Sequence, residues 1–467
     1  MKTTRTAQRL LCAVMAFFML FPIIGCQSSQ GDPNSDPEST PSGEVSSAGP
    51  ESSTGEQDTT ANDTDKAEET NDMSTQTGTS NVINFKNKKC MWLSQYDLNS
   101  VYTANGGQRN QTQFEKYIKK ILANVKEQGI NTIIVQVRPN ADSMYPSDVY
   151  PMSKYVVGAY GKEATYDPFE FIINEAHEIG LSVQAWINPM RAMTTSEITK
   201  VDGRYKIRAW YDDKSLNGKY LVTVNKTVYL NPAYPEVREL IIDGAREILA
   251  RYPVDGLHMD DYFYPTTEAS FDSAAYAEYK KGGGKSSLAD FRRDVLSELV
   301  AGLYSTTKAA GSDILFGISP AGNINTVYEK QYADVYRWCS EAGYLDYICP
   351  QVYFGLEHQT YDFKKVSKTF ENIIKLDSVE LIIGMTLGKA KSGEDKYAGN
   401  GKNEWREHDD ILLRCLDHTQ TLERCRGVAY FCYQYFFDPL SGVEVRETKT
   451  ERDNFIPLLK TITWTAE

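Results

Sequence analysis

The sequence predicts a (β/α)8 TIM barrel, and three observations favour this fold class. From Lys88 onward, short apolar runs alternate with amphipathic runs, which is the pattern of repeated βα units and a parallel sheet. Eight such units fit into the remaining 380 residues, about the size expected for a barrel with long loops. No Gly-rich dinucleotide loop follows the first apolar run, which argues against a doubly wound open sheet, the competing fold.

The expected strands are the short apolar runs, in chain order Cys90–Tyr96, Asn131–Arg138, Leu181–Asn188, Val254–Asp260, Ile314–Ser319, Tyr347–Tyr353, Leu381–Thr386 and Val428–Gln434. The expected helices are the amphipathic runs, namely Gln113–Gln128, Pro168–Ile179, Pro235–Arg251, Ser287–Lys308, Gln331–Ala342, Phe363–Leu376, Glu407–Leu422 and Glu451–Lys460. Two loops, Met193–Val228 and Gly388–Asn403, are long enough to shape a cleft.

Residues 1–26 are typical of a signal peptide. A basic start leads into the apolar run Leu10 to Phe21, which is too short for a membrane span. The following Gly25-Cys26 resembles a bacterial lipobox, so we expect Cys26 to be lipidated. The alternative is ordinary signal-peptide cleavage, with Cys26 a free thiol. The first interpretation predicts an extracytoplasmic protein that is lipid-anchored to the bacterial cell membrane.

Residues 27–84 form an acidic linker rich in Ser and Thr, and they contain too few apolar side chains to fold. Residues 27–80 hold twelve acidic residues and one Lys, so most of the net charge of −13 lies outside the predicted barrel at 85–467. Nucleic acid is therefore not an expected partner. The chain has no CxxC motif and its five His are scattered, so no metal site and no cofactor are expected.

Strand alternation gives a test of the barrel. Side chains along a barrel strand alternate between the interior and the helix layer, so polar residues should share one parity. On five strands they do, at Gln136, Arg138, Gln184, Trp186, Asn188, His258, Asp260, Gln351, Tyr353 and Gln434. These positions also lie toward the carboxyl ends of their strands, where barrel active sites form. By this rule Asp260 points into the mouth, and Asp261 points sideways toward a loop.

Seven segments resemble those of the glycosyl-hydrolase-like family 10 domain, formerly a domain of unknown function. They are NTIIVQVRPNADSMYPS (131–147), LSVQAWINPMR (181–191), YLNPAYPEVRELI (229–241), VDGLHMDDYFYP (254–265), LFGISPAGN (315–323), YICPQVYF (347–354) and GVAYFCYQYF (427–436). The resemblance runs from about Met91 to about Leu440 and implies a TIM barrel related to glycoside hydrolases.

The resemblance also points to particular residues at the ends of four strands. The matching positions are Arg138 and Asp142 after the second strand, Asn188, Pro189 and Arg191 after the third, Asp260 and Asp261 after the fourth, and Gln351 with Tyr353 at the sixth.

Glycoside cleavage usually needs two carboxyl groups, one that protonates the leaving oxygen and one that acts as nucleophile or base. Asp260 is the expected nucleophile, with His258 two residues before it on the same side of the strand. The acid stays open among Asp261 and three loop residues, Asp142, Glu357 and Asp438. Arg138 would lower the pKa of Asp142 and favour a carboxylate that binds sugar hydroxyls.

Aromatic and cationic side chains near the strand ends are candidates for sugar contacts. Tyr262, Tyr353 and Tyr435 fall at the predicted rim, where rings can stack on pyranose faces, and Trp186 lies just below. Arg191 has two interpretations, a site for an anionic group such as a sugar carboxylate or a structural partner for a loop acid.

The sequence therefore predicts a glycosidase that acts on a cell-envelope or extracellular polysaccharide, with peptidoglycan glycan as the first choice. One alternative is a carbohydrate-binding lipoprotein that has no catalytic acid. A second alternative, a metal-dependent deacetylase or hydrolase, would need more ligands than His258 supplies.

Overall fold

The structure is a computed structural model and describes residues 82–464. The predicted signal peptide, Cys26 and the predicted linker up to residue 81 lie outside the described residues. Within residues 82–464, no helix is long and apolar enough to cross a membrane.

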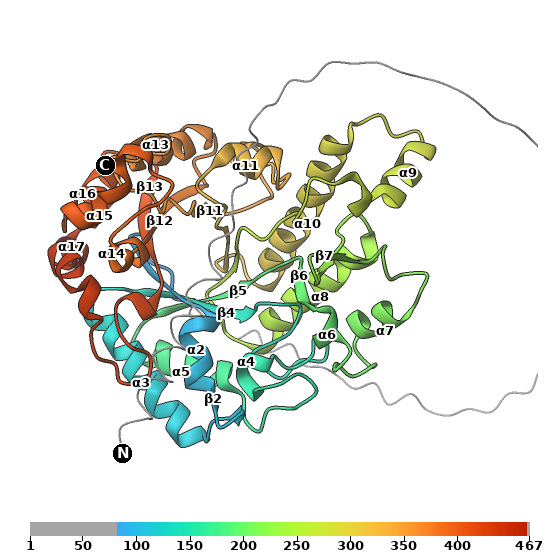
Figure 1. Cartoon of the computed structure of the whole chain (residues 1–467), viewed down its shortest axis with the longest axis horizontal. Helices are drawn as coiled ribbons and strands as arrows, with labels where there is room; N and C mark the ends of the chain where they lie inside the picture. The colour runs from blue at the N-terminus through green and yellow to red at the C-terminus, as the bar shows by residue number, and fades with distance from the viewer. Residues whose placement is uncertain (1–81, 465–467) are drawn as a thin grey trace, which may run out of the picture. The chain divides into compact units, whose positions relative to one another are not determined.

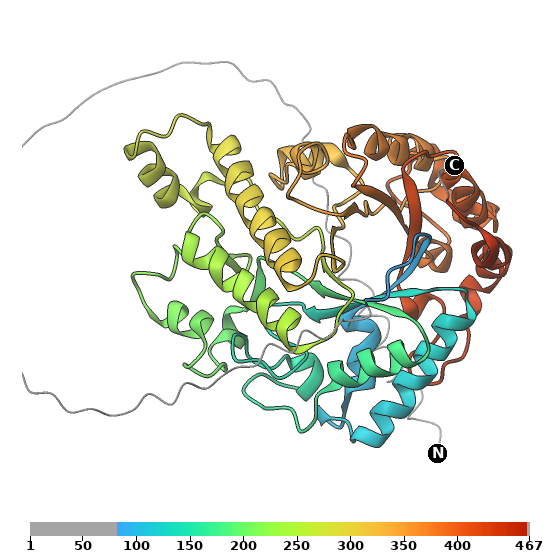
Figure 2. The same cartoon turned by 180° about the vertical axis from the view of Figure 1, so that it is seen from behind.

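Eight parallel strands close into a barrel, as predicted (Figure 1). In chain order they are β1 (Lys88–Leu93), β4 (Thr132–Arg138), β5 (Ser182–Ile187), β9 (Gly256–Met259), β10 (Leu315–Ile318), β11 (Tyr347–Ile348), β12 (Glu380–Thr386) and β13 (Cys425–Phe431). Each strand pairs with the next barrel strand along the chain, and β13 pairs with β1 to close the ring. Figure 2 shows the first strand, in blue, beside the last strands, in red.

A layer of helices surrounds the barrel, with α8 and α10 on one flank and α13, α16 and α17 on the other (Figure 1). The main helices are α3 (Gln111–Glu127), α5 (Pro168–Glu178), α8 (Pro235–Arg251), α10 (Leu288–Ala310), α13 (Phe363–Ile373), α16 (Ile411–Thr419) and α17 (Lys449–Thr461). The helix predicted at 331–342 is wrong over much of its length. It shrinks to α12 (Val335–Trp338). Its late start follows from Tyr332, which takes a left-handed φ of 56° that a helix does not tolerate.

Three predicted strands end more than one residue earlier in the structure. The first stops at Leu93, because Ser94 caps a helix that starts at Gln95. The sixth keeps only Tyr347–Ile348, since Pro350 has no N–H to continue the ladder. The eighth runs from Cys425 to Phe431, and Gln434 lies in a following 3-10 turn.

The loops at the carboxyl ends of the strands contain the smaller elements. The helices there are α2 (Gln95–Tyr102), α4 (Lys154–Val157), α6 (Thr195–Ile198), α7 (Lys206–Asp212), α9 (Ser273–Lys281), α11 (Ile324–Glu329), α14 (Gly388–Ser392) and α15 (Glu404–Glu407). Short strands form a hairpin of β2 (Thr103–Ala104) and β3 (Gly107–Gln108) and an antiparallel sheet of β6 (Arg191–Thr194), β7 (Leu221–Val224) and β8 (Thr227–Leu230).

The barrel interior is a packed layer of side chains separate from the core under the helices. It contains Trp92, Ile134, Trp186, Tyr347 and Cys349, all nearly inaccessible. The Tyr347 ring has room because the residue paired with it on β10 is Gly317. A Cβ at Gly317 would lie 1.9 Å from the ring. A residue without a side chain is therefore required at this position.

Replacing Gly317 with Ala should destabilise the fold by about 1–3 kcal/mol, the usual cost of overpacking a close-packed interior. Urea unfolding followed by circular dichroism measures the change. Gly203→Ala is a matched control, because a Cβ at Gly203 meets nothing within 4 Å. Equal stability of the two variants would show that the interior layer can shift to accept a methyl group.

Candidate active site

Polar side chains meet at the carboxyl ends of the barrel strands. Asp260 directly follows β9, and only 2% of its surface is exposed. Asn188 follows β5 and is 1% exposed, while Gln136 lies near the end of β4. The strand alternation rule predicted that these three side chains face the mouth, and the hydrogen bonds between them confirm it.

A chain of hydrogen bonds delivers a donor to Asp260. The backbone N–H of Gln95 donates to Oε1 of Gln136 at 2.7 Å. Nε2 of Gln136 then donates to Oδ1 of Asn188, also at 2.7 Å, and Nδ2 of Asn188 donates to Oδ2 of Asp260. Because a backbone N–H can only donate, the orientation of both amides follows from Gln95. Asp260 is therefore held as an acceptor, the role of a carboxylate.

Asp261 stays at the mouth beside Asp260. Its Oδ1 accepts a hydrogen bond from Nε2 of Gln351 at 3.1 Å, and the same nitrogen donates to the backbone oxygen of Ser319. The expectation that Asp261 points away toward a loop is wrong, because β9 ends at Met259 and strand alternation does not extend to residue 261.

The two carboxyl groups share an electrostatic environment. Burial raises the pKa of Asp260 well above its usual range, and the charge of Asp261 raises it further. Three nearby groups partly offset this rise in the pKa of Asp260. They are the backbone N–H of Tyr262, the indole of Trp186 and the charge of Arg191. Burial also raises the pKa of Asp261. Two adjacent carboxyls of this kind hold one proton between them over a range of pH.

The hydrogen bonds indicate which of the two carboxyls keeps that proton. Both oxygens of Asp260 accept hydrogen bonds, from Asn188 and from the backbone N–H of Tyr262 at 3.2 Å. Asp261 accepts a side-chain hydrogen bond on Oδ1 only, and it is more exposed than Asp260. Hydrogen bonds to the charged form favour the carboxylate, so we assign the charge to Asp260 and the proton to Asp261.

Arg191 lies among tyrosines at the rim. Its guanidinium carbon is 5.0 Å from the ring centre of Tyr262. Three further tyrosines, Tyr96, Tyr155 and Tyr229, are near enough to raise the pKa of Arg191. No salt bridge to Arg191 forms within residues 82–464, and the side chain is partly exposed. The predicted structural pairing with a loop acid is therefore absent from the described part of the chain.

His258 does not reach the mouth. Its side chain is fully buried in the barrel interior, where Nδ1 lies 2.7 Å from the Tyr347 hydroxyl and Nε2 lies 3.4 Å from Nε1 of Trp92. The Tyr347 hydroxyl donates to Gln184, so Nδ1 of His258 carries the proton and Nε2 accepts from Trp92. The prediction that His258 contacts substrate is wrong, because its polar atoms are satisfied below the mouth.

Arg138 lies outside the barrel, which also corrects a prediction. The pairing of β4 with β5 shifts between Gln136 and Arg138, so that Arg138 stands opposite the outward-facing Ile187. The guanidinium is fully buried, and Nη1 donates to the Tyr150 hydroxyl and to the backbone oxygen of Ile241, both at 3.2 Å. The bulge therefore removes Arg138 from the predicted substrate contacts.

The predicted loop acids do not converge on Asp260. Asp142 is fully buried, and its oxygens accept hydrogen bonds from the backbone N–H of Asn140 and from the Tyr160 hydroxyl. Burial raises the pKa of Asp142. Glu357 is exposed and lies 3.9 Å from His408, and Asp438 caps its own turn through Ser441. Asp261 is the remaining candidate for the acid.

Other predicted sugar contacts do lie at the rim. Tyr353 is partly exposed, stacks on Phe431 at 5.8 Å, and is close enough to Asp261 for that charge to raise its pKa. Tyr435 is partly exposed beneath Lys391, whose nitrogen is 5.8 Å from the ring centre. Gln434 is partly exposed, and its backbone N–H donates to Asp97 at 2.7 Å.

Sequence reasoning missed Gln95 and Asp97, which connect the first strand to the site. Ser94 and Asp97 form a reciprocal capping box at the start of α2. The spacing Ser-x-x-acid is a known helix-start signal, but here it lies inside a run that also fits a strand. A prediction based on that signal would have ended the first strand before Gln95. It would also have put the Gln95 N–H at the carboxyl end of that strand.

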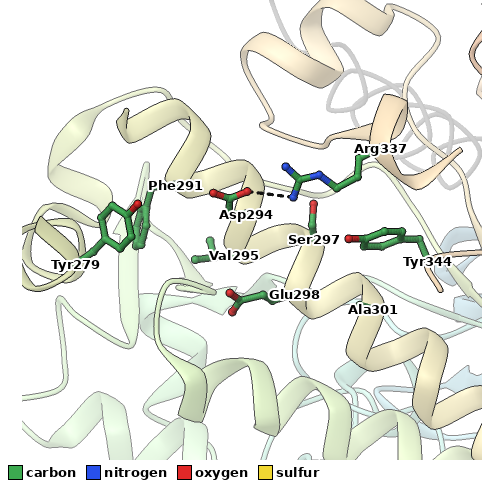
Figure 3. A pocket seen from close by; sticks show the side chains of 9 residues that line it. All are labelled: Tyr279, Phe291, Asp294, Val295, Ser297, Glu298, Ala301, Arg337 and Tyr344. Carbon is green, nitrogen blue, oxygen red and sulfur yellow. Dashed lines mark hydrogen bonds and ion pairs between the residues drawn. The ribbon is translucent and has the colours of Figure 1, made fainter. Parts of the chain in front are cut away.

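Two cavities lie outside the barrel. One has a volume of about 370 Å³ and lies against α10, which contributes Phe291. Tyr279, Arg337 and Tyr344 from other segments also line it (Figure 3). One of its two acids, Asp294, is paired with Arg337 at 3.0 Å. The other, about 430 Å³, lies against α8 and is lined by Asp148, Arg204 and Arg246 among others. Neither cavity contains Asp260 or Asp261, the candidate residues at the barrel mouth.

A closed parallel barrel with an acid pair after its fourth strand fits the glycoside-hydrolase-like class that the sequence predicted. The chain belongs to the family described as "Glycosyl hydrolase-like 10", whose model matches residues 87–398.

Similar proteins support this assignment. A protein named glycosyl hydrolase YngK, from Bacillus subtilis (strain 168), is 31% identical over 361 residues, which cover 73% of this chain and 67% of YngK. Glycosyl hydrolase DigH from Escherichia coli (strain K12) is 31% identical over 366 residues, 73% of this chain and 80% of DigH.

Solved structures share the fold. The glycoside hydrolase domain of PgaB (BpsB) from Bordetella bronchiseptica superposes with a TM-score of 0.51 at 12% identity, covering 79% of this chain and 98% of that domain. The catalytic domain of β-amylase from Paenibacillus polymyxa gives 0.50 at 10% identity, with 80% and 98% covered. At these identities the likeness shows the barrel fold alone.

His258 should make stability depend on pH. Burial lowers the pKa of its imidazole from 6.5 to about 3, so the unfolded chain binds a proton that the folded chain does not. The contribution is complete above pH 6.5 and is lost as the pH falls toward 3, by up to about 1.4 kcal/mol per pH unit.

The measurement is the slope of unfolding free energy against pH between pH 4 and 6. His258→Gln should lower this slope by up to one proton. An unchanged slope for His258→Gln would show that the imidazole is protonated inside the barrel.

Proposed function

We propose that this protein hydrolyses a glycosidic bond in a cell-envelope or extracellular polysaccharide, with peptidoglycan glycan as the leading substrate. The observation that carries the proposal is the acid pair Asp260 and Asp261, with its charge fixed by the hydrogen-bond chain from Gln95. Family membership supports glycosidase chemistry. An extracytoplasmic location, with lipid on Cys26 holding the protein at the membrane, belongs to the same proposal, because it keeps the barrel near the wall.

The two acids take different roles. Asp260 acts as the carboxylate beside the anomeric carbon, the position that the sequence assigned to the nucleophile. Asp261 acts as the general acid, because it is more exposed than Asp260 and accepts a hydrogen bond from another side chain on Oδ1 only. Asp142, the other predicted catalytic residue, keeps at most a supporting role, because its oxygens are bound within its own loop.

Substrate contacts follow from exposure at the rim. Tyr262, Tyr353 and Tyr435 offer partly exposed rings for stacking on sugar faces. Polar contacts would come from Gln351 and Gln434, which are also partly exposed. Asn188 and Trp186 lie deeper and would act on the sugar next to Asp260.

Asp260→Asn and Asp261→Asn test the catalytic assignment. Loss of an acid or base group typically costs about 10²–10⁴-fold in rate, so both variants should release reducing ends from purified glycan strands at least that much more slowly. Asp261→Asn should recover partly on substrates with activated aryl leaving groups, which need no protonation. Glu357→Gln, at an exposed acid outside the site, is the control and should match the wild type.

A different result would favour a non-catalytic protein. If the wild type releases no reducing ends from any envelope glycan tested, and Asp260→Asn binds glycan equally well, the chain is a carbohydrate-binding lipoprotein. Calorimetric titration with glycan strands measures that binding.

Arg191 should select substrates with an anionic group. It is partly exposed without a salt bridge in the described residues, and a charge-assisted hydrogen bond contributes about 1.5–3 kcal/mol. Arg191→Gln should therefore lower kcat/KM about 10- to 100-fold on a glycan that carries carboxylates. The loss should be smaller on the same glycan after its carboxylates are reduced to alcohols, because only the effect of Arg191 on the charge of Asp260 then remains.

Arg204→Gln is the matched control, because Arg204 also lies over a tyrosine ring, at 4.8 Å, but on the exposed surface. Equal losses for Arg191→Gln on both glycans would mean that Arg191 supports the Tyr262 ring rather than an anion.

A further inference from the structure

We propose that the 2-acetamido group of the substrate sugar, and not a carboxylate of the protein, attacks the anomeric carbon. Asp260 accepts the amide N–H of that group and stabilises the charge that develops on it, and Asp261 protonates the leaving oxygen. The inference rests on the proposed function and refines one role within it: Asp260 assists the nucleophile instead of being the nucleophile.

The first argument is the position of the two acids. In a double displacement through an enzyme carboxylate, the acid and the nucleophile flank the bond that breaks. Asp260 and Asp261 are successive residues at the end of one strand, so both approach the substrate from the β9 side of the mouth. One acid can serve the leaving oxygen while the other serves a neighbouring group of the same sugar.

The second argument is the way Asp260 is held. It is 2% exposed, and both of its oxygens already accept hydrogen bonds. An ester with the sugar would cancel the charge that the Tyr262 N–H and Arg191 stabilise and that Asn188 hydrogen-bonds. Accepting one more hydrogen bond, from an amide N–H, keeps that charge, because a carboxylate oxygen has a second lone pair.

The third argument is that no other acid is free for the attack. Within residues 82–464, five further acids near the strand ends already have partners in the fold. These acids are Asp97, which caps α2; Asp142, which binds Asn140 and Tyr160; Glu357, which faces His408; Glu404, which binds the backbone of Leu356; and Asp438, which binds Ser441.

A buried donor beside Asp260 fits the carbonyl of an acetamido group. The Trp186 side chain is 6% exposed, and its indole N–H has no hydrogen-bond partner among the described residues. The indole N–H approaches the Asp260 carboxyl and lowers its pKa, although its geometry falls short of a hydrogen bond. A substrate amide would pair its N–H with Asp260 and leave its carbonyl oxygen for a nearby donor, which removes an otherwise costly unpaired group.

The reaction balances without any further reagent. The acetamido oxygen attacks C1, the bond from C1 to the leaving oxygen breaks, and the Asp261 proton moves to that oxygen. The product is an oxazolinium ring whose N–H is held by Asp260. Asp261, now a carboxylate, takes a proton from water, and the water oxygen attacks C1 and reopens the ring. Two displacements at C1 give retention of configuration.

Fluorine substitution of the acetyl group tests the proposal on the wild-type protein. A glycan that the protein cleaves is prepared with N-acetyl, N-fluoroacetyl and N-difluoroacetyl groups, and kcat/KM is measured for each. Fluorine makes the carbonyl oxygen a weaker nucleophile, so the rate should fall on the order of 10²-fold across the series. An unchanged rate, or a product of inverted configuration by NMR, would overturn the proposal and leave the glycosidase assignment intact.

Azide gives a second, independent test. Asp260→Ala with azide should yield no glycosyl azide of inverted configuration, because no enzyme nucleophile has been removed. Formation of that azide would make Asp260 the nucleophile and overturn the proposal. A melting curve checks that the variant folds, and the fluorine series decides the question if it does not. Failure of the wild type to cleave any glycan would instead count against the proposed function.

Discussion

The backbone N–H of Gln95 fixes the charge at the active site. A side-chain amide can turn over and exchange donor for acceptor, but a backbone N–H cannot. Because the N–H of Gln95 meets the oxygen of Gln136, the amides of Gln136 and Asn188 both point their nitrogens toward Asp260. The start of α2 therefore sets the orientation of the amide that donates to Asp260 at the end of β9.

Polar contacts at the carboxyl ends of the strands hold the start of α2 in place. The capping box of Ser94 and Asp97 sets where α2 begins, and Asp97 also accepts the backbone N–H of Gln434 after β13. The first and last strands are thus joined above the barrel at the point where the donor chain starts. A shift of α2 would move the Gln95 N–H and release Asn188 from Asp260.

The fold could be predicted from the sequence because barrel units repeat the same physical pattern. The helix at Pro235–Arg251 has the predicted bounds, since its apolar face and its flanks are unambiguous. Local backbone effects set the limits elsewhere. Pro350 shortens β11 by removing an N–H, and the left-handed φ of Tyr332 breaks a helix whose amphipathic pattern continues past it.

The site was predictable only as far as strand alternation holds. Asn188 and Asp260 face the mouth as predicted, because β5 and β9 have no bulge before them. Arg138 turns outward because one extra residue on β4 reverses its side, and a bulge leaves no mark in an apolar and polar pattern. His258 keeps the predicted side of its strand but lies too deep, and depth within a barrel depends on strand tilt, which no single sequence segment encodes.

The adjacency of Asp260 and Asp261 has a mechanical consequence. Acids on different strands change their separation when the barrel deforms, whereas the separation of two successive residues is limited by one peptide unit. The substrate then has to be positioned against one rim of the barrel. The rings of Tyr262 and Tyr353 flank this rim, one next to Asp261 in the chain and one near it in space. The acid pair and its nearest stacking surfaces therefore form one unit at the end of β9.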